Sequence, residues 1–376
     1  MKPLKILAIA PYTILPANSG GRLAIVTLHE YLGRICEDHI AGTVSNASGQ
    51  GHHFHLHRIF PDSKLRYRPG FATREMADII RAEGISCIIC EHPYMAFSAI
   101  SLSRKLGIPW FMRSHNIESE RFRSLGKPWW PAMRWFERYA MQKATGVFFI
   151  TPEDRRWAIQ HYGLNDRQSH LALYGTPLDK APERDTATRQ QLAATLGIPA
   201  DVPWLYFLGA LDYQPNAAAV ACIIRGLLPR LRQNGSAFRI IIAGKGLDTT
   251  LQQEIAQTDG LITYAGFVPD LHDFLNACDV MINPVLTGGG IKTKAVEALG
   301  YNKMLVTTES GAAGIMPEVC GTNMLRVPDN DLDAFARAIA AAVSATPAIP
   351  DSFYQRYYWG NIAREAAAIL QEHIKG

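Results

Sequence analysis

Short apolar runs alternate with longer amphipathic stretches along almost the whole chain. Runs of this kind, bounded by turn residues, are typical of strands that are buried on both faces of a parallel sheet. The amphipathic stretches between them have the spacing of helices that cover such a sheet. The pattern therefore predicts an α/β protein built from repeated strand–helix units.

The predicted strands fall into two series. They are residues 4–10, 87–90, 110–115, 147–150 and 171–175 in the first series, and residues 204–209, 239–244, 261–266, 280–284 and 304–308 in the second. A polar, proline-containing stretch between the two series has the composition of a linker. Because 376 residues exceed the size at which one core keeps growing, we expect domains at residues 1–175 and 176–350. Residues 351–376 are expected to form a C-terminal helix that can cross back to the first domain.

The composition is that of an ordinary globular protein, with 48% hydrophobic and 19% charged residues. The first apolar run ends at Pro11 without a cleavage pattern, which favours a strand over a signal peptide. No segment approaches the roughly 20 apolar residues that span a bilayer. Six scattered cysteines form no disulfide framework. We therefore expect a cytoplasmic protein, whose net charge of +4 favours anionic ligands without calling for nucleic acid.

A glycine-containing loop follows the first predicted strand and leads into an amphipathic helix over residues 22–32. Ser19, Gly20 and Gly21 therefore lie at a helix N-terminus, where backbone N–H groups and the helix dipole favour an anion. The segment is not G-x-G-x-x-G, so it does not indicate a nicotinamide site. A plain strand-to-helix turn is the alternative interpretation.

The most specific passage is residues 280–303, VMINPVLTGGGIKTKAVEALGYNK. It reads as a strand, a glycine loop with lysines, and a helix. The loop and the start of the helix contain Thr287, Gly288, Gly289, Gly290, Ile291, Lys292 and Lys294. Glycines at a helix start open a pocket for phosphate, and the two lysines bring cations to a diphosphate. Glu297 follows on the helix, where an ionised carboxylate can accept hydrogen bonds from sugar hydroxyls.

This passage resembles the nucleotide-sugar loop of glycosyltransferase family 4, and especially of bacterial polysaccharide-assembly members with a GGG-[IT]-[KR]-x-K-x-x-E-A loop. The segments SGGR, RSHNIES, FLGALDYQPN, AGFVPDL and TTESGAAGI extend the resemblance over nearly the whole chain. The resemblance implies a GT-B fold, in which two Rossmann-like domains face each other across a cleft. It also implies a retaining hexosyltransferase of cell-surface polysaccharide biosynthesis, which moves a sugar from a nucleoside diphosphate sugar to a glycan or lipid-linked acceptor. Neither a cofactor nor a metal is expected.

The resemblance also implies roles for single residues. The catalytic residues would be His115, Lys292, Lys294 and Glu297. Donor-binding residues would be Gly20, Gly21, Gly209, Phe267, Val268, Thr287, Gly288, Gly289, Gly290 and Ile291. Acceptor-side residues would be Arg22, Asn116 and Glu118. The histidine would bind a sugar hydroxyl or stabilise the oxocarbenium-like transition state, the lysines would neutralise the diphosphate, and the glutamate would bind the ribose.

The chain departs from the family pattern at two places. Of the two glutamates that usually stand eight positions apart, the first would fall at Gly289. The cations found in many relatives after the strand at residues 204–209 are also missing, because residues 211–215 contain neither arginine nor lysine. We therefore expect the diphosphate to depend on Lys292 and Lys294. The departures leave two alternatives open: a nucleotide-sugar epimerase of the same fold, and a non-catalytic nucleotide-sugar-binding or scaffold protein.

Two further segments carry weaker signals. A strand at GHHFHLHR would place His53, His55 and His57 on one face. A metal site there is conceivable, but no cysteine or carboxylate stands alongside, which favours an exposed strand or an acceptor-facing loop. Residues 127–143 mix three tryptophans with basic residues. They could attach the protein peripherally to the inner face of the membrane, stack on an acceptor sugar, or pack in the core.

Overall fold

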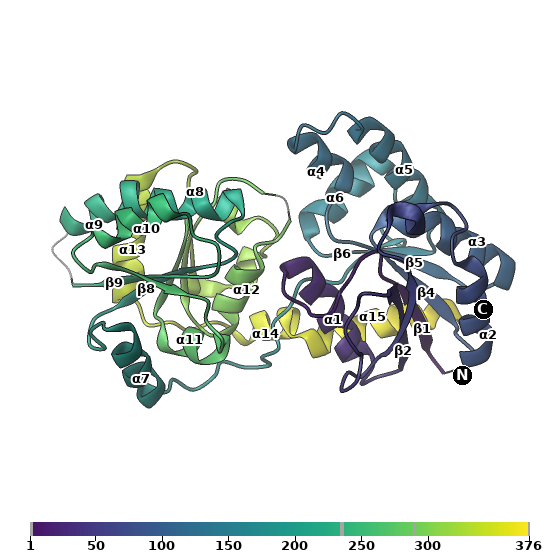
Figure 1. Cartoon of the computed structure of the whole chain (residues 1–376), viewed down its shortest axis with the longest axis horizontal. Helices are drawn as coiled ribbons and strands as arrows, with labels where there is room; N and C mark the ends of the chain where they lie inside the picture. Colours follow the sequence, from purple (N-terminus) through teal and green to yellow (C-terminus); the bar gives the residue numbers. More distant parts are fainter. Residues whose placement is uncertain (1–2, 234–236, 289, 375–376) are drawn as a thin grey trace. The chain divides into compact units, whose positions relative to one another are not determined.

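The computed structural model describes residues 3–233, 237–288 and 290–374. The chain divides into two compact units. Unit 1 comprises Met1–Gly175 and Trp359–Gly376, and unit 2 comprises Thr176–Tyr358. The chain therefore leaves unit 1 once and returns to it in its last helix (Figure 1).

Within the described residues, unit 1 contains a seven-stranded parallel sheet of order β3-β2-β1-β4-β5-β6-β7. Its strands are β1 (Lys5–Ile9), β2 (Glu37–Thr43), β3 (His55–Phe60), β4 (Cys87–Glu91), β5 (Trp110–Ser114), β6 (Gly146–Phe149) and β7 (Ser169–Leu171). Its helices are α1 (Gly20–Leu32), α2 (Thr73–Glu83), α3 (Ala96–Leu106), α4 (Glu118–Ser124), α5 (Trp130–Lys143), α6 (Pro152–Tyr162) and α15 (Trp359–Ile374). The direction in which successive strands are added reverses between β1 and β4.

The apolar runs form strands because both faces of this sheet are covered. Leu7 and Ile9 of β1 join a core beneath helices α2, α3, α5 and α6, whereas Ala8 faces the opposite side together with Ile25 of α1. Strands β4 and β5 are buried along their whole length. Helix α15 packs against α1, so the end of the chain completes the cover of unit 1 (Figure 1).

Unit 2, as far as it is described, contains a six-stranded parallel sheet of order β10-β9-β8-β11-β12-β13. Its strands are β8 (Trp204–Leu208), β9 (Arg239–Ala243), β10 (Ile262–Gly266), β11 (Val280–Asn283), β12 (Met304–Thr308) and β13 (Met324–Val327). Its helices are α7 (Thr186–Leu196), α8 (Gln214–Cys222), α9 (Leu228–Gln233), α10 (Thr249–Ala256), α11 (Leu271–Ala277), α12 (Thr293–Gly300), α13 (Leu332–Ser344) and α14 (Asp351–Tyr357). Here the strand order reverses between β8 and β11.

The parallel sheets confirm the predicted α/β architecture, and the differences lie at particular strands. The expected strand at residues 171–175 begins earlier, as β7. Strands β2 and β13 were not predicted: β2 begins with Glu37, Asp38 and His39, whose polarity hides it, and β13 has only four residues. Where one helix was expected over residues 351–376, the described residues 351–374 form two, α14 in unit 2 and α15 in unit 1. In the described part of the chain, no helix combines the length and the apolar character needed to cross a membrane.

Candidate active site

In both units, the candidate site residues follow the carboxyl ends of strands at or near the point where the strand order reverses. Parallel α/β sheets bind ligands outside the carboxyl ends of their strands, at this switch point. In unit 2 the loops that follow β8 and β11 flank the switch point, and in unit 1 the loops that follow β1 and β4 do so. The candidate site residues of each unit are therefore described at these edges, one unit at a time.

The glycine loop of unit 2 connects β11 to α12. Gly288 and Gly290 have φ angles of 95° and 72°, a left-handed conformation that favours glycine. Lys292 turns back over the loop, and its Nζ donates to the carbonyl oxygens of Gly288 at 2.6 Å and Gly290 at 3.2 Å. Thr287 is exposed, Ile291 is buried, and the predicted donor residue Gly289 lies outside the described residues. Lys292 therefore holds the described glycines on either side of residue 289 through their carbonyl oxygens.

Lys294, in the first turn of α12, is a buried cation at the same edge. Its side chain is only 7% exposed, and its Nζ donates to Asn216 Oδ1 at 2.7 Å. The amine also lies 3.8 Å from the centre of the Phe207 ring, within the range of a cation–π interaction. Because Asn216 belongs to α8, which follows β8, this bond links the starts of the two helices that follow β8 and β11. The tertiary structure thus holds Lys294 where the sequence motif predicts a phosphate site.

The two lysines are removed from water to a degree that changes their titration. Burial, and to a lesser extent the neighbouring Lys292, lower the pKa of Lys294 to about 7, although Glu297 acts in the opposite direction. Burial lowers the pKa of Lys292 to about 8. Desolvation disfavours the charged form of an amine, and an incoming anion restores it. The pair is therefore poised to gain stability from a diphosphate.

The remaining predicted site residues of unit 2 lie at the same edge of its sheet. Glu297 is half-buried on α12, one turn after Lys294. Gly209 directly follows β8, and a Cβ added to it would lie 2.8 Å from Asn216 Nδ2. Phe267 follows β10 and is 60% exposed, and Val268 is half-buried beside it. An exposed aromatic ring at this edge can stack on a nucleotide base.

Three residues that the sequence did not indicate complete this group. Asn216 and Phe207 position Lys294, as described above. Lys245 follows β9, and its Nζ lies 4.2 Å from the centre of the Phe267 ring. It is exposed, and its backbone carbonyl accepts from the Leu211 N–H at 2.8 Å, so a lysine stands beside the loop after β8, which contains no cation of its own. The sequence did contain a signal for this residue, because Lys245 stands between two glycines at the end of a predicted strand.

In unit 1, the predicted anion site lies at the start of α1. Gly20 and Gly21 are exposed in its first turn. A Cβ added to Gly21 would lie 3.4 Å from the Tyr12 hydroxyl, so glycine keeps this approach open. The Arg22 guanidinium donates to Asn18 Oδ1 at 3.0 Å. The first turn thus presents backbone N–H groups to solvent, as the sequence predicts.

His115, directly after β5, is held in a buried cluster. Its side chain is 4% exposed, its Nε2 lies 2.5 Å from Glu91 Oε2, and its ring stacks on His92 at a centroid distance of 4.1 Å. Burial and the adjacent His92 lower the pKa of His115 to about 3, against the raising effect of Glu91. The imidazole is therefore neutral at physiological pH. Because an ionised Glu91 only accepts, Nε2–H donates to it and Nδ1 keeps its lone pair.

Glu91, the last residue of β4, is the centre of that cluster and was not predicted. Burial alone would raise its pKa, but Arg113 and hydrogen bonds from His115 and His29 hold the pKa well below its usual range. His29 Nε2 lies 3.1 Å from Glu91 Oε1, and its Nδ1 lies 2.7 Å from Asp38 Oδ2. Burial opposes protonation of His29, but the two carboxylates raise its pKa to about 9. A buried anion between two cations therefore orients His115.

Glu118, predicted on the acceptor side, is fully buried and engaged within unit 1. Its Oε2 accepts from the Tyr94 hydroxyl at 2.7 Å and from Arg121 at 3.0 Å, and its Oε1 lies 3.3 Å from His92 Nδ1. Burial would raise its pKa, but His92, Arg121 and Tyr94 lower it to about 2. Its neighbour Asn116 is half-buried, and its amide lies 3.5 Å from Glu118 Oε1.

A cavity of about 460 Å³ in unit 2 lies away from these residues. It is lined near the amino-terminal ends of β8, β11 and β12, by residues such as Pro203, Val280 and Met304. Arg189 on its wall donates to Asp279 and to three backbone carbonyls. These hydrogen bonds hold α7 against the sheet. Arg189 and Asp279 therefore have a structural role in the wall of this cavity.

Two family models match the chain, one on each unit. Residues 25–179 match the model described as Glycosyltransferase Family 4, and residues 202–345 match the model described as Glycosyl transferases group 1. A comparison with curated protein sequences finds no significant match. The two matches together include most of the candidate site residues, from Arg113 and His115 to Lys294 and Glu297.

Solved structures resemble the chain along its whole length. A glycosyltransferase from Rickettsia africae ESF-5 is 12% identical with a TM-score of 0.69, covering 100% of this chain and 95% of that chain. HepE of Anabaena, in complex with UDP and glucose, is 16% identical with a TM-score of 0.66, covering 98% and 95%. WaaG, a glycosyltransferase involved in lipopolysaccharide biosynthesis, is 12% identical with a TM-score of 0.66, covering 98% and 98%. These likenesses show the GT-B fold, and with a glycosyltransferase family model matched on each unit, the chain is a GT-B glycosyltransferase similar to family 4.

Proposed function

We propose that the protein is a retaining hexosyltransferase that moves a sugar from a nucleoside diphosphate sugar to a glycan or lipid-linked acceptor in cell-surface polysaccharide biosynthesis. The observation that carries the donor assignment is the placement of the half-buried Lys292 and the buried Lys294 at the switch point of unit 2. Two similar structures support it: HepE contains UDP and glucose, and WaaG is described as a lipopolysaccharide glycosyltransferase. We propose that the reaction needs no metal cofactor.

In unit 2, the lysines would stabilise negative charge on the departing diphosphate. Preorganised cations in a site shielded from water stabilise developing charge more than exposed ones do. Lys294 is fixed by Asn216 and Phe207, so little reorganisation accompanies the reaction. Glu297 would accept hydrogen bonds from the ribose, and the exposed Phe267 would contact the base.

In unit 1, His115 would act on the sugar as a neutral imidazole. With Nε2–H donated to Glu91, its Nδ1 can accept a hydrogen bond from a sugar hydroxyl. We assign Glu91 as the residue that positions this ring. Gly20 and Gly21 would bind phosphate through backbone N–H groups, whereas Arg22 and Asn116 would contact the acceptor. Because Glu118 is buried against Tyr94 and Arg121, we propose that it supports the loop instead of binding acceptor directly.

A panel of UDP-, GDP-, ADP- and dTDP-sugars tests the proposal. Thermal shift identifies the donor, since a ligand at 100 times its Kd adds about 2.7 kcal/mol of stability. Slow hydrolysis of that donor, and transfer with retained anomeric configuration once an acceptor is supplied, would support the assignment. Acceptor-independent conversion of the sugar would instead indicate an epimerase. Binding without any turnover would indicate a scaffold protein, and the absence of binding to every donor would contradict the donor site.

The depressed lysine pKa values predict how nucleotide affinity depends on pH. The ammonium forms exist below the pKa values of about 7 and 8 for Lys294 and Lys292 and are lost as the pH rises through them. Because a diphosphate binds the charged forms, we expect the Kd for UDP to rise by up to about tenfold per pH unit for each lysine. Calorimetric titrations between pH 7 and 9, where the UDP phosphates are ionised, measure this slope. An affinity that stays constant over this range would contradict the role of the lysines.

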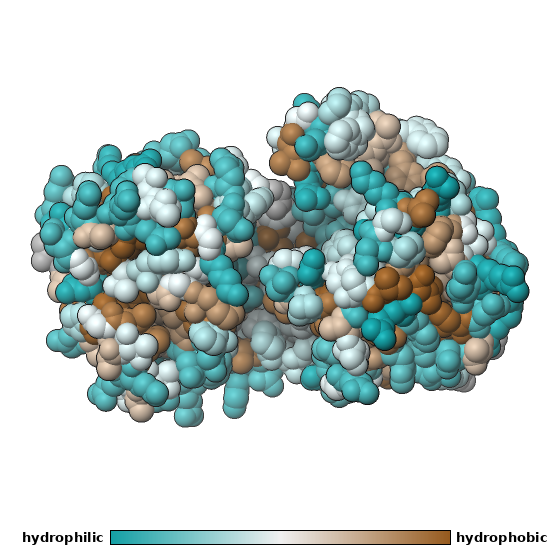
Figure 2. All heavy atoms as spheres, in the orientation of Figure 1, coloured by the Kyte–Doolittle hydropathy of each residue, from teal (hydrophilic) through white to brown (hydrophobic). Residues whose placement is uncertain are grey.

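A second part of the proposal concerns peripheral attachment to an anionic membrane surface through α4 and α5. Leu125, Trp129 and Trp135 are 55%, 52% and 66% exposed. Arg123 and Lys127 lie over the rings of Trp130 and Trp129 at 5.5 and 5.7 Å. Figure 2 shows hydrophobic side chains among hydrophilic ones over α4 and α5. Exposed tryptophans beside basic residues favour the headgroup region of a bilayer.

We expect the double substitution Trp129→Ala and Trp135→Ala to reduce binding to vesicles containing anionic lipid at least fivefold. Co-sedimentation with such vesicles, and with vesicles of neutral lipid as a comparison, measures the effect. The rings at these positions are exposed, so the fold should be retained, which circular dichroism verifies. Full recovery of the unmodified protein in the supernatant would contradict membrane attachment.

A further inference from the structure

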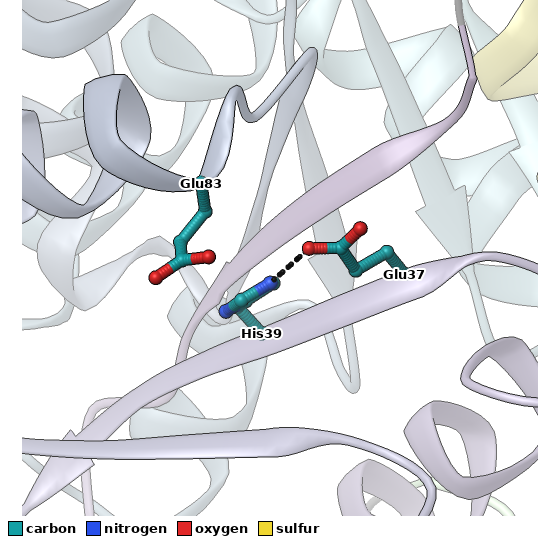
Figure 3. A group of neighbouring side chains, drawn as sticks. All are labelled: Glu37, His39 and Glu83. Atoms are coloured by element: carbon teal, nitrogen blue, oxygen red, sulfur yellow. Dashed lines mark hydrogen bonds and ion pairs between the residues drawn. The ribbon is translucent and has the colours of Figure 1, made fainter.

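Three side chains of unit 1 bring metal-binding atoms together outside the candidate active site (Figure 3). Glu37 and His39 lie on β2, and Glu83 is the last residue of α2. One carboxylate or imidazole atom from each lies within 4.8 Å of the other two. Glu37 and His39 lie at the amino-terminal end of a strand, whereas His115 follows the carboxyl end of β5 in the same parallel sheet. The group therefore lies at the opposite edge of the sheet from the proposed sugar site.

The spacing of these atoms suits one small divalent ion. Glu37 Oε1 lies 3.1 Å from His39 Nε2, and two ligands of a tetrahedral zinc ion, each about 2.0–2.1 Å from the metal, are about 3.3 Å apart. Figure 3 shows the carboxylates of Glu37 and Glu83 directed toward the His39 ring from two sides. The ligand atom of Glu83 lies within 4.8 Å of those of Glu37 and His39.

The surroundings hold the His39 ring in a metal-binding orientation. The residue is buried, at 3% exposure, and its Nδ1 lies 2.9 Å from His57 Nε2. The rings of His57 and His55 pack against it at centroid distances of 5.2 and 4.9 Å. With its Nε2 bound to metal, His39 would donate Nδ1–H to His57, and such a bond to the second ring nitrogen is usual for a histidine ligand.

The charge of the group also favours a divalent cation. Lys5 Nζ lies 2.7 Å from Glu37 Oε2 and donates to the backbone oxygen of Glu83 at 3.0 Å. The single positive charge of Lys5 therefore balances only one of the two carboxylates, Glu37 and Glu83. Because Oε2 of Glu37 faces the lysine, Oε1 remains directed at His39.

We propose that Glu37, His39 and Glu83 form a structural binding site for a divalent ion of the zinc class, with water completing the coordination. Imidazole and carboxylate ligands together suit this ion. The bound ion would fasten the end of α2 to the edge of the sheet. The structure differs from the sequence-based expectation in where the side chains lie. His53 lies outside β3 and pairs with Glu30, and Glu37 of β2 and Glu83 of α2 lie near His39, which packs against His55 and His57.

Calorimetric titration of the full chain with ZnCl₂ tests the site. We expect one equivalent to bind, and Glu83→Gln to weaken binding at least tenfold. Glu75→Gln, an exposed change on the same helix, should retain the original affinity. Visible absorption of Co²⁺, displaced by Zn²⁺, gives a second readout of imidazole coordination.

Three results would overturn the proposal: no zinc binding, equal affinities for the Glu83→Gln and Glu75→Gln variants, or loss of binding in a His53→Ala variant, which would place the ion beside Glu30. Circular dichroism shows whether each variant is folded. The site does not depend on the proposed sugar transfer, so Glu83→Gln should leave nucleotide binding unchanged. Failure of one proposal is therefore distinguishable from failure of the other.

Discussion

Glu91→Gln is expected to lower the free energy of unfolding of unit 1 by about 3–5 kcal/mol, because it removes the anion from a buried charge cluster. Arg113 and His29 would keep their positive charges in the protein interior, with Asp38 left as the partner of His29. Hydrogen exchange of the β4 and β5 amides along a denaturant series measures this loss within unit 1 alone. The same variant should also bind sugar more weakly, since His115 loses the partner that orients its ring.

The matched control is Glu153→Gln on α6. Glu153 pairs with Arg156, but both side chains are largely exposed, and exposed ion pairs contribute little to stability. Its exchange profile should therefore match that of the unmodified protein. If Glu91→Gln were as stable as this control, the cluster would not be held together by its central charge.

Lys294→Ala is expected to lower the turnover number at least tenfold, equivalent to about 1.4 kcal/mol of transition-state stabilisation. The lysine is buried at the switch point of unit 2, and its loss would leave the leaving diphosphate with fewer compensating charges. Single-turnover rates measure the chemical step directly and separate it from product release. Unchanged single-turnover rates would contradict the assignment.

Two companion variants make this experiment specific. Lys294→Met fills nearly the same volume beside Phe207 without the charge, so it should lose turnover while retaining the packing. Lys180→Ala removes an exposed lysine from the segment before α7 and should leave turnover unchanged. If the alanine variant alone were impaired, the packing of the lysine stem would explain its effect better than its charge.

The buried lysines and the Glu91 cluster illustrate one physical principle. In both, burial removes charged groups from water. It lowers the pKa of Lys294 and of His115, which favours the neutral form of each side chain. Neighbouring groups offset this cost where the charge is retained, as for Glu91. For Lys294 the offset is incomplete until an anion binds, which is the signature expected of a binding site. In the Glu91 cluster, the charge of the carboxylate is already balanced by Arg113 and His29. This fits a role for Glu91 in positioning His115.

The amino-acid sequence by itself determined the α/β architecture and indicated the glycine–lysine loop. Strands buried on both faces must be apolar throughout, so their runs are visible along the chain, and the loop's glycines and lysines are adjacent in sequence. The polar start of β2 hid that strand, because Glu37, Asp38 and His39 break the apolar pattern.

Only the tertiary structure decided which distant residues meet. Lys294 is 78 positions from Asn216, and Glu91 is 62 positions from His29, so no local spacing predicts either contact. The order of strands in each sheet brings them together, because parallel strands collect their carboxyl ends at one edge whatever their separation along the chain. Glu83, at the end of α2, likewise reaches His39 near the start of β2 only once α2 has packed against the sheet, and no local spacing relates its carboxylate to the histidines.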